Sequence, residues 1–297
     1  MSDVLSLAMK IPSSSHASLV SRLSDDKPLM AVELRPPPAD LSTTDSMDTW
    51  IDMYHSLRQL ASDDTIVFIT DNAVGQSEEE NLQHLTTNLA GELDPATVVP
   101  FLTCKHSLDY CLMYAKRAAS RGIAALTVLG GDKSVGAPRC VPHAFELRRA
   151  IREQVASLTL GGWVNPYRAP EEQVDFLLRE DFNADFYLTQ IVSHHNISQV
   201  DRFLSEATRR DVRYPGVFGV FYYRSANPRT LARLAQYFPV PAEGITRDFE
   251  AGLTADEICA RTIRALREVG ATKVYLSNLG FRGVDRRYNS IRAVLNA

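Results

Sequence analysis

Carboxyl and amide side chains recur within or just after short apolar segments, and their types suit the binding of a polar heterocycle. Glu33 lies inside the segment AVEL. Burial of an unpartnered carboxylate is unfavourable by several kcal/mol, so we interpret Glu33 as a functional residue; a hydrogen-bonded structural carboxylate is the alternative. Gln190 follows the segment FYLT, and its neutral amide both donates and accepts, which suits a heterocycle with mixed hydrogen-bonding edges.

A second carboxylate and two glycines follow the apolar segment that ends at Leu129. Asp132 comes directly after Gly130 and Gly131. Glycines allow a ligand to approach the backbone closely, which a side chain would prevent. An aspartate in this setting is as readily a turn or helix-capping residue, so both interpretations of Asp132 stay open at this point.

Aromatic and hydroxyl side chains mark the ends of other apolar segments. Tyr222 and Tyr223 follow Phe221 and offer either a stacking wall for a flat ligand or simple packing. Thr70 and Thr103 also end apolar segments, although threonine is more often an ordinary strand residue.

Several familiar catalytic and metal-binding patterns are missing from the sequence. His194 and His195 are adjacent, and adjacent residues point in different directions on a strand or helix, so we expect a loop or surface feature rather than a chelate. The sequence has no Ser/His/Asp signature, GxSxG elbow or Walker loop, which disfavours hydrolysis and phosphoryl transfer from nucleotides. It also lacks GxGxxG after a strand, so a nicotinamide or flavin would have to bind elsewhere than in a Rossmann crevice.

Composition and charge indicate a globular, enzyme-sized protein. The 297 residues are 45% hydrophobic and 23% charged, with a net charge of −4, which disfavours nucleic acid or an anionic membrane as the main partner. The apolar stretch 122–129 is far shorter than the roughly 20 residues that span a bilayer. The four cysteines form no CxxC pair, and the start MSDVLSLAMK lacks the pattern of a secretion signal. We therefore expect a cytoplasmic protein without disulfides or a structural metal.

Short apolar segments alternate with longer amphipathic segments along the chain, and these elements must position the side chains named above. We predict eight strands, at Leu29–Leu34, Thr65–Thr70, Val98–Leu102, Ala125–Leu129, Thr159–Val164, Phe186–Gln190, Val217–Phe221 and Lys273–Ser277. We predict helices at Thr44–Ala61, Ser77–Glu92, Ser107–Arg121, His143–Ala156, Pro170–Glu180, Ile197–Arg210, Pro228–Tyr237, Thr254–Val269 and Asp285–Leu295. A further helix is expected in PAEGITRDFEAGLT, before the eighth strand.

Eight strand–helix alternations without a linker predict one (β/α)8 TIM barrel over residues 29–297. Residues 1–28 are expected to form an N-terminal arm or helix that could seal the barrel bottom. Thr254 and Glu257 have the spacing of a capping box, and Gly270 supplies the stop of that helix. In such barrels the active site lies where the strands end, and nearly every predicted strand ends there in a polar residue.

The ordered segments resemble the methylenetetrahydrofolate reductase family of the MetF type, from about Met30 to about Leu279. The resemblance is carried by AVELRPPP, IVFITDN, VVPFLTC, LTVLGGD, HAFEL, NADFYLTQIV, YPGVFGVF and KVYLSNL, which occur in the family's order. It implies reduction of 5,10-methylenetetrahydrofolate to 5-methyltetrahydrofolate, with a hydride passing from NADH or NADPH through FAD.

The resemblance also implies residue roles. Glu33 matches the family's general acid, which needs a protonated and therefore partly desolvated carboxyl. Asp132 matches the catalytic aspartate near the pterin and the flavin. Substrate-binding positions are implied at Gln190, Tyr223, Thr103 and Arg282, which lies near Leu279, where the family has an arginine. From charge and position alone, we expect Arg282 or Arg224 to meet the glutamate tail of the folate. Cofactor-binding positions are implied at Thr70, Phe101, Leu129, Gly130, Gly131, Asp132, His143, Ala144, Asn165, Asp175 and Arg179.

The departures from the family concern the flavin. Phe101 replaces a family histidine, Gly130 replaces an arginine, and Leu178 lies within the altered polar cluster near Asp175 and Arg179. We expect FAD in an altered site, and the alternatives are direct hydride transfer from NADH or a folate- or flavin-binding partner of a methyltransferase without reductase activity. Family members are often oligomers, so a homo-oligomer is possible, although no isolated apolar stripe requires one.

Overall fold

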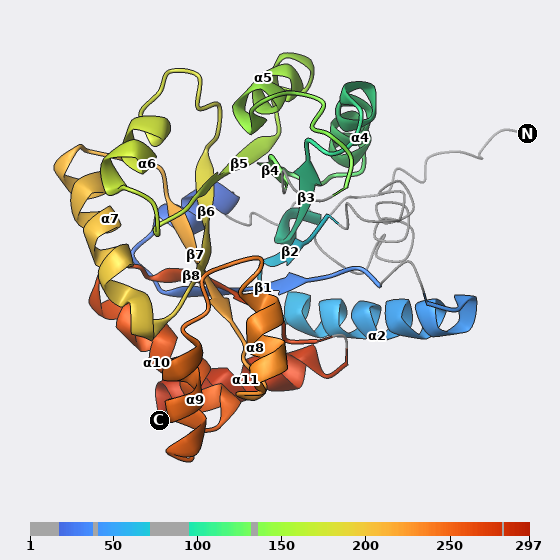
Figure 1. Ribbon diagram of the computed structural model, residues 1–297. Coiled ribbons are helices and arrows are strands. Elements are labelled where there is room, and N and C mark those ends of the chain that lie inside the picture. The colour runs from blue at the N-terminus through green and yellow to red at the C-terminus, as the bar shows by residue number, and fades with distance from the viewer. Residues whose placement is uncertain (1–17, 38–40, 72–94, 132–135, 281) are drawn as a thin grey trace, which may run out of the picture.

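The predicted strands pair in chain order and close on themselves, as the computed structural model shows (Figure 1). The structure describes residues 18–37, 41–71, 95–131, 136–280 and 282–297. The strands are β1 (Leu29–Leu34), β2 (Val67–Ile69), β3 (Val98–Thr103), β4 (Ala125–Leu129), β5 (Thr159–Val164), β6 (Phe186–Val192), β7 (Gly216–Phe221) and β8 (Lys273–Ser277). All eight neighbouring pairs are parallel, and β8 pairs with β1. The predicted (β/α)8 barrel is therefore confirmed.

Alternation along each strand divides the core between the barrel interior and the helical layer. Ala31, Phe68 and Tyr275 belong to a buried cluster that fills the interior. Val32 and Leu276, one position along their strands, pack instead in the cluster beneath the helices. Successive side chains of a strand point to opposite faces, so the side chains that follow the interior residues by two positions line the barrel mouth.

Glycines in the strands make room for large interior side chains. A Cβ at Gly219 of β7 would lie 2.5 Å from the hydroxyl oxygen of Tyr275. That hydroxyl donates a 2.7 Å hydrogen bond to the backbone carbonyl of Thr189 in β6. The register of β6 against β7 shifts between Leu188 and Ile191, so a bulge lies where β6 approaches the mouth.

Helices follow most strands and surround the barrel (Figure 1). They are α1 (Leu19–Ser24), α2 (Thr43–Ser62), α4 (Leu108–Ser120), α5 (Ala144–Gln154), α6 (Pro170–Leu177), α7 (Ile197–Arg209), α8 (Pro228–Leu234), α9 (Ala242–Glu250), α10 (Ala255–Glu268) and α11 (Val284–Asn296). Short 3-10 turns lie at η1 (Pro95–Thr97) and η2 (His194–Asn196). The predicted helix 77–92 lies outside the described residues.

Local signals in the sequence explain where α10 begins and ends. Thr254 accepts a hydrogen bond from the Glu257 backbone, and the Glu257 carboxylate accepts one from the Thr254 backbone, which confirms the predicted capping box. Gly270 takes a φ of 91° just beyond the helix, a conformation that glycine adopts without strain.

The N-terminal helix α1 lies at the end of the barrel where the strands begin. Leu19 and Leu23 are buried in the same cluster as the interior residues. Lys273, at the start of β8, pairs with Asp25 at 2.7 Å just after α1. None of the helices in the described part of the chain is long and apolar enough to cross a membrane.

Candidate active site

Glu33 and Ser277 meet at the mouth of the barrel, where β1 and β8 end. The Ser277 hydroxyl donates a 2.5 Å hydrogen bond to Oε1 of Glu33. The register that pairs Val32 with Leu276 places these two residues side by side, two positions beyond Ala31 and Tyr275. Ser277 could not be identified as a site residue from the sequence, because a serine at the end of a strand carries no signal of its own.

The surroundings of Glu33 favour its protonated form. Burial raises the pKa of Glu33, while the Ser277 hydrogen bond and the charge of Arg35 act in the opposite direction. The pKa of the Tyr275 phenol is also raised, by burial and then by the Glu33 carboxylate, so burial at the barrel centre favours the protonated form of both groups. A carboxyl in this state is equipped to donate a proton at the mouth.

A carboxylate–imidazole pair links the ends of β2 and β3. Asp71, whose side chain is fully buried, accepts a 2.8 Å hydrogen bond from the Thr103 backbone and lies 3.1 Å from Nε2 of His106. The Thr103 hydroxyl is buried and has no hydrogen-bond partner among the described residues. His106 was not singled out from the sequence, since a lone histidine after a strand is usually structural.

Two cations hold the backbone after β4 in place. Lys105 donates to the carbonyl of Ala137 at 2.9 Å, and Arg139 donates to the carbonyl of Gly131. A Cβ on Gly131 would lie 2.7 Å from Lys105, and one on Gly130 would lie 2.7 Å from the Arg139 guanidinium, so both glycines make these contacts possible. The predicted catalytic residue Asp132 lies outside the described residues.

Gln190 lies in the bulge of β6. Its side-chain oxygen accepts a 2.9 Å hydrogen bond from the backbone of Ile191. The Thr189 hydroxyl donates to the Gln190 carbonyl and accepts from the backbone of Gly219. These bonds fix the bulge, and the Gln190 side chain remains partly exposed.

Tyr223 is 4% exposed and packs among residues of α8, α9 and α10. Its ring lies 5.0 Å from that of Phe221, which contacts the interior cluster, and its buried hydroxyl has no hydrogen-bond partner in the described part of the chain. Burial raises the pKa of Tyr223, so the phenol stays neutral. Phe221 is therefore nearer the barrel interior, and Tyr223 packs between Phe221 and the outer helices.

Two of the implied cofactor positions come together at the start of α5. His143, next to Ala144, stacks on Phe145 at 5.4 Å, and the Arg179 guanidinium lies 4.6 Å from the centre of the same ring. Arg179, however, donates two hydrogen bonds of 2.7 and 2.8 Å to Asp181.

The other implied cofactor positions divide between the mouth and the helical layer. Asp175 pairs with Arg210, which caps α7, so it joins two outer helices. Phe101 is buried and Leu129 is partly buried in the interior cluster. Thr70 is partly exposed at the end of β2, and the Asn165 side chain accepts from the Tyr167 backbone in a turn after β5.

The two arginines expected near the folate tail are engaged at the surface. Arg282 is 76% exposed and pairs with Asp52 of α2 at 2.6 Å. Arg224 donates to the backbone carbonyl of Asn278 at 3.2 Å, and Asn278 takes a left-handed φ of 69°. Arg224 is thus bound to the end of β8, at the residue that follows Ser277.

The histidine pair departs from the expectation of a loop or surface feature. His194 and His195 form a 3-10 turn after β6, their ring centres are 3.9 Å apart, and both Nε2 atoms reach Oδ2 of Asp248. The prediction that adjacent side chains diverge was wrong here, because both imidazoles turn toward one buried carboxylate.

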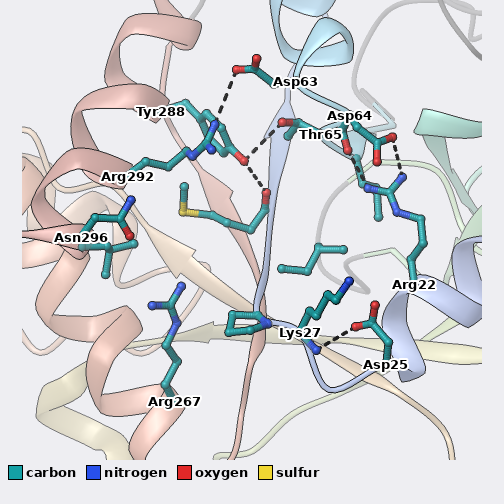
Figure 2. Close-up of a pocket in the computed structure, with 15 residues that line it drawn as sticks. Arg22, Asp25, Lys27, Asp63, Asp64, Thr65, Arg267, Tyr288, Arg292 and Asn296 are labelled. Atoms are coloured by element: carbon teal, nitrogen blue, oxygen red, sulfur yellow. Dashed lines mark hydrogen bonds and ion pairs between the residues drawn. The ribbon is translucent and has the colours of Figure 1, made fainter.

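A hollow of about 380 Å³, shown in Figure 2, lies where β1 begins, whereas Glu33 lies near the end of that strand. It is lined by the beginnings of β1 and β2 and by the ends of α2 and α11. Its charges are largely balanced, because Arg22 pairs with Asp64 and Arg292 with Asp63. Since catalytic groups of this fold lie at the strand ends, we do not assign the reaction to this hollow.

Comparisons with solved structures place the chain among TIM barrels. It is similar to an uncharacterised protein from Clostridium thermocellum that binds two copies of 5-methyl-5,6,7,8-tetrahydrofolic acid, with a TM-score of 0.63 and 16% identity over 91% of this chain and 95% of that one. It is also similar to sialic acid aldolase from Aliivibrio salmonicida, with a TM-score of 0.50 and 15% identity over 91% of this chain and 75% of that one. At these identities the likeness shows the fold. No protein-family model and no curated protein matches the chain.

Proposed function

We propose that the chain binds a reduced folate at the barrel mouth and reduces 5,10-methylenetetrahydrofolate to 5-methyltetrahydrofolate with a hydride from NADH or NADPH. The observation that carries the proposal is Glu33, a carboxyl at the mouth whose pKa is raised by burial and whose Oε1 is held by Ser277. The folate bound by the Clostridium thermocellum protein, which shares the barrel, supports the choice of ligand.

The chemistry assigns a clear role to Glu33. Its proton passes to N10 of the bridged folate, the bond between N10 and the bridging carbon breaks with its electron pair moving to N10, and an N5 iminium forms. The hydride then adds to the iminium carbon and gives the N5 methyl group. General acids of this kind contribute roughly 10²–10⁴-fold in rate.

The other mouth residues would orient the ligand. The Gln190 amide is suited to the pterin edge, and the buried Thr103 hydroxyl is a further polar contact. Asp132 stays a proposed partner of the pterin. Arg224 and Arg282 would bind the glutamate tail by exchanging their present partners, the Asn278 carbonyl and Asp52, for its carboxylates; both side chains are exposed.

The fit of FAD is poor in the described residues. The pyrophosphate of FAD calls for free cations or backbone donors, whereas Arg179 is bonded to Asp181, Arg139 to Gly131 and Lys105 to Ala137. We therefore derive no step through FAD. The hydride donor is NADH or NADPH, and whether FAD carries the hydride between donor and folate is decided by the experiment below.

The test is anaerobic oxidation of NADH and NADPH that depends on added methylenetetrahydrofolate. Flavin-stripped protein is assayed with and without supplied FAD. Turnover that requires FAD supports a flavoprotein reductase, and equal turnover without it supports direct transfer. Tight folate binding without any oxidation would overturn the reductase and favour a folate-binding partner of a methyltransferase.

A further inference from the structure

Three side chains with metal-ligating atoms converge beside the end of β6. They are His194 and His195 of η2 and Asp248 of α9, and one ligand atom of each lies within 4.8 Å of the others. Nε2 of His194 is 3.0 Å and Nε2 of His195 is 2.8 Å from Oδ2 of Asp248. Asp248 is 6% exposed, so the carboxylate they share is removed from water.

Neighbouring groups fix the direction of each ligand. The Nδ1 atom of His194 lies 2.9 Å from the Thr262 hydroxyl of α10. Arg261 binds the other carboxylate oxygen of Asp248 at 2.9 Å, which leaves Oδ2 for the histidines. A Cβ on Gly244 would lie 2.6 Å from the His195 ring, so this ring rests directly on the α9 backbone. Such outer contacts orient histidine and carboxylate ligands in metal sites.

The hydrogen bonds leave one nitrogen unexplained. The Thr262 hydroxyl donates to the carbonyl of Ile258, so its oxygen accepts from Nδ1–H of His194. In this tautomer Nε2 of His194 carries a lone pair, and this buried atom has no hydrogen-bond donor within the residues that the structure describes. It lies 3.0 Å from Oδ2 of Asp248, which also carries lone pairs, so in this tautomer a cation between the two atoms removes their repulsion, whereas in the other tautomer an Nε2 proton does so.

We propose that His194, His195 and Asp248 bind one divalent transition-metal ion of the zinc class. Two imidazole nitrogens and one carboxylate oxygen form a donor set that zinc and cobalt accept, with water in the fourth position. Ligand atoms about 2.0–2.1 Å from a tetrahedral ion lie roughly 3.3 Å apart. The two distances from Nε2 to Oδ2 of Asp248, 3.0 and 2.8 Å, are therefore a few tenths of an ångström short of that separation. The charge of Arg261 weakens the ion's attraction to Asp248 and sets the affinity below that of a four-ligand site.

The ion would tie α9 to the connection between β6 and α7. The helices α8 and α9 lie between the seventh and eighth strands, and Phe221 and Tyr223 pack against them. Metal binding would therefore stabilise this part of the barrel rim. The proposal does not depend on the folate reductase, because it concerns different residues and has a separate readout.

The test is titration of chelator-treated, full-length protein with Co²⁺ and Zn²⁺. Wild-type protein is expected to bind one Co²⁺ per chain with visible absorption bands of a tetrahedral site, to release it to Zn²⁺, and to melt at a higher temperature with Zn²⁺. His194→Gln and His195→Gln are expected to lose at least about 100-fold in affinity, since each removes a direct ligand. The matched control is His55→Gln on the exposed face of α2, which should bind as wild type does.

Wild-type protein that binds no ion in the micromolar range, or His194→Gln that binds as tightly as wild type, overturns the proposal. If the histidine variants do not fold, imidazole ¹⁵N spectra of the wild-type protein decide. Zn²⁺ is expected to shift the Nε2 signals of both histidines, and Nε2 protons that persist on both at saturating Zn²⁺ show a hydrogen-bonded cluster instead.

Discussion

The Ser277 hydroxyl donates to Oε1 of Glu33 across 2.5 Å, although 244 residues separate them in the chain. The pair forms only because β8 closes the barrel against β1. The hydrogen bond fixes the orientation of the Glu33 carboxyl at the mouth. It also lowers the pKa of Glu33 and so offsets part of the increase that burial causes.

Removal of the acid should stop the proposed reaction. We expect Glu33→Gln to lower kcat for methylenetetrahydrofolate reduction by about 10²–10⁴-fold, because glutamine cannot donate the proton. Folate binding measured by calorimetry and the circular dichroism spectrum should change little. Wild-type turnover in this variant contradicts the assigned role.

Removal of the hydroxyl should move the pH profile of activity. The Ser277 hydrogen bond lowers the pKa of Glu33, so Ser277→Ala raises it further. The acid form then persists to higher pH, and the alkaline fall of kcat/KM is expected at higher pH than in wild type. Ser277→Thr keeps a hydroxyl and should retain the wild-type profile, and a fall shifted to lower pH in the alanine variant refutes the pairing.

The buried carboxyl should also make stability depend on pH. Folded protein keeps the Glu33 proton to higher pH than unfolded protein, because burial raises the pKa. Between the two pKa values the folded state binds more protons, so the free energy of unfolding of wild type relative to Glu33→Gln falls as pH rises. The fall is at most about 1.4 kcal/mol per pH unit. Urea unfolding from pH 4 to 8 measures it, and parallel curves for the two proteins contradict it.

Arg148 should be a main contributor to stability. It is 1% exposed, donates to the carbonyls of Phe182 and Val128, and lies over the Phe182 ring. Arg148→Ala leaves a cavity and two unpaired carbonyls, so we expect a loss of about 3 kcal/mol in the free energy of unfolding. Arg149→Ala, at the next and exposed position, is the control and should change it by less than about 0.5 kcal/mol.

The barrel and most of its elements were predictable from the sequence. Four strands have the predicted bounds, for example Leu29–Leu34 and Lys273–Ser277, because apolar, β-branched runs bounded by turn residues are local signals. The capping box at Thr254 was equally readable, since its two partners are three residues apart. The predicted ends of helices were less accurate. The helix α6 ends at Leu177 and not at the predicted Glu180, and no glycine or other helix-stop residue directly follows Leu177 in the sequence to mark that end.

The eightfold alternation and the polar ends of the strands, including Glu33, could be predicted because periodicity and turn chemistry act over a few residues. Which of these polar groups meet depends on how the strands and helices pack in the folded protein. Closure of the barrel brought Ser277 to Glu33, and packing of α9 brought Asp248 to a histidine pair that local geometry had predicted to diverge. Such contacts depend on strand register and helix docking, which sum many weak interactions over the whole chain, and no short segment encodes them.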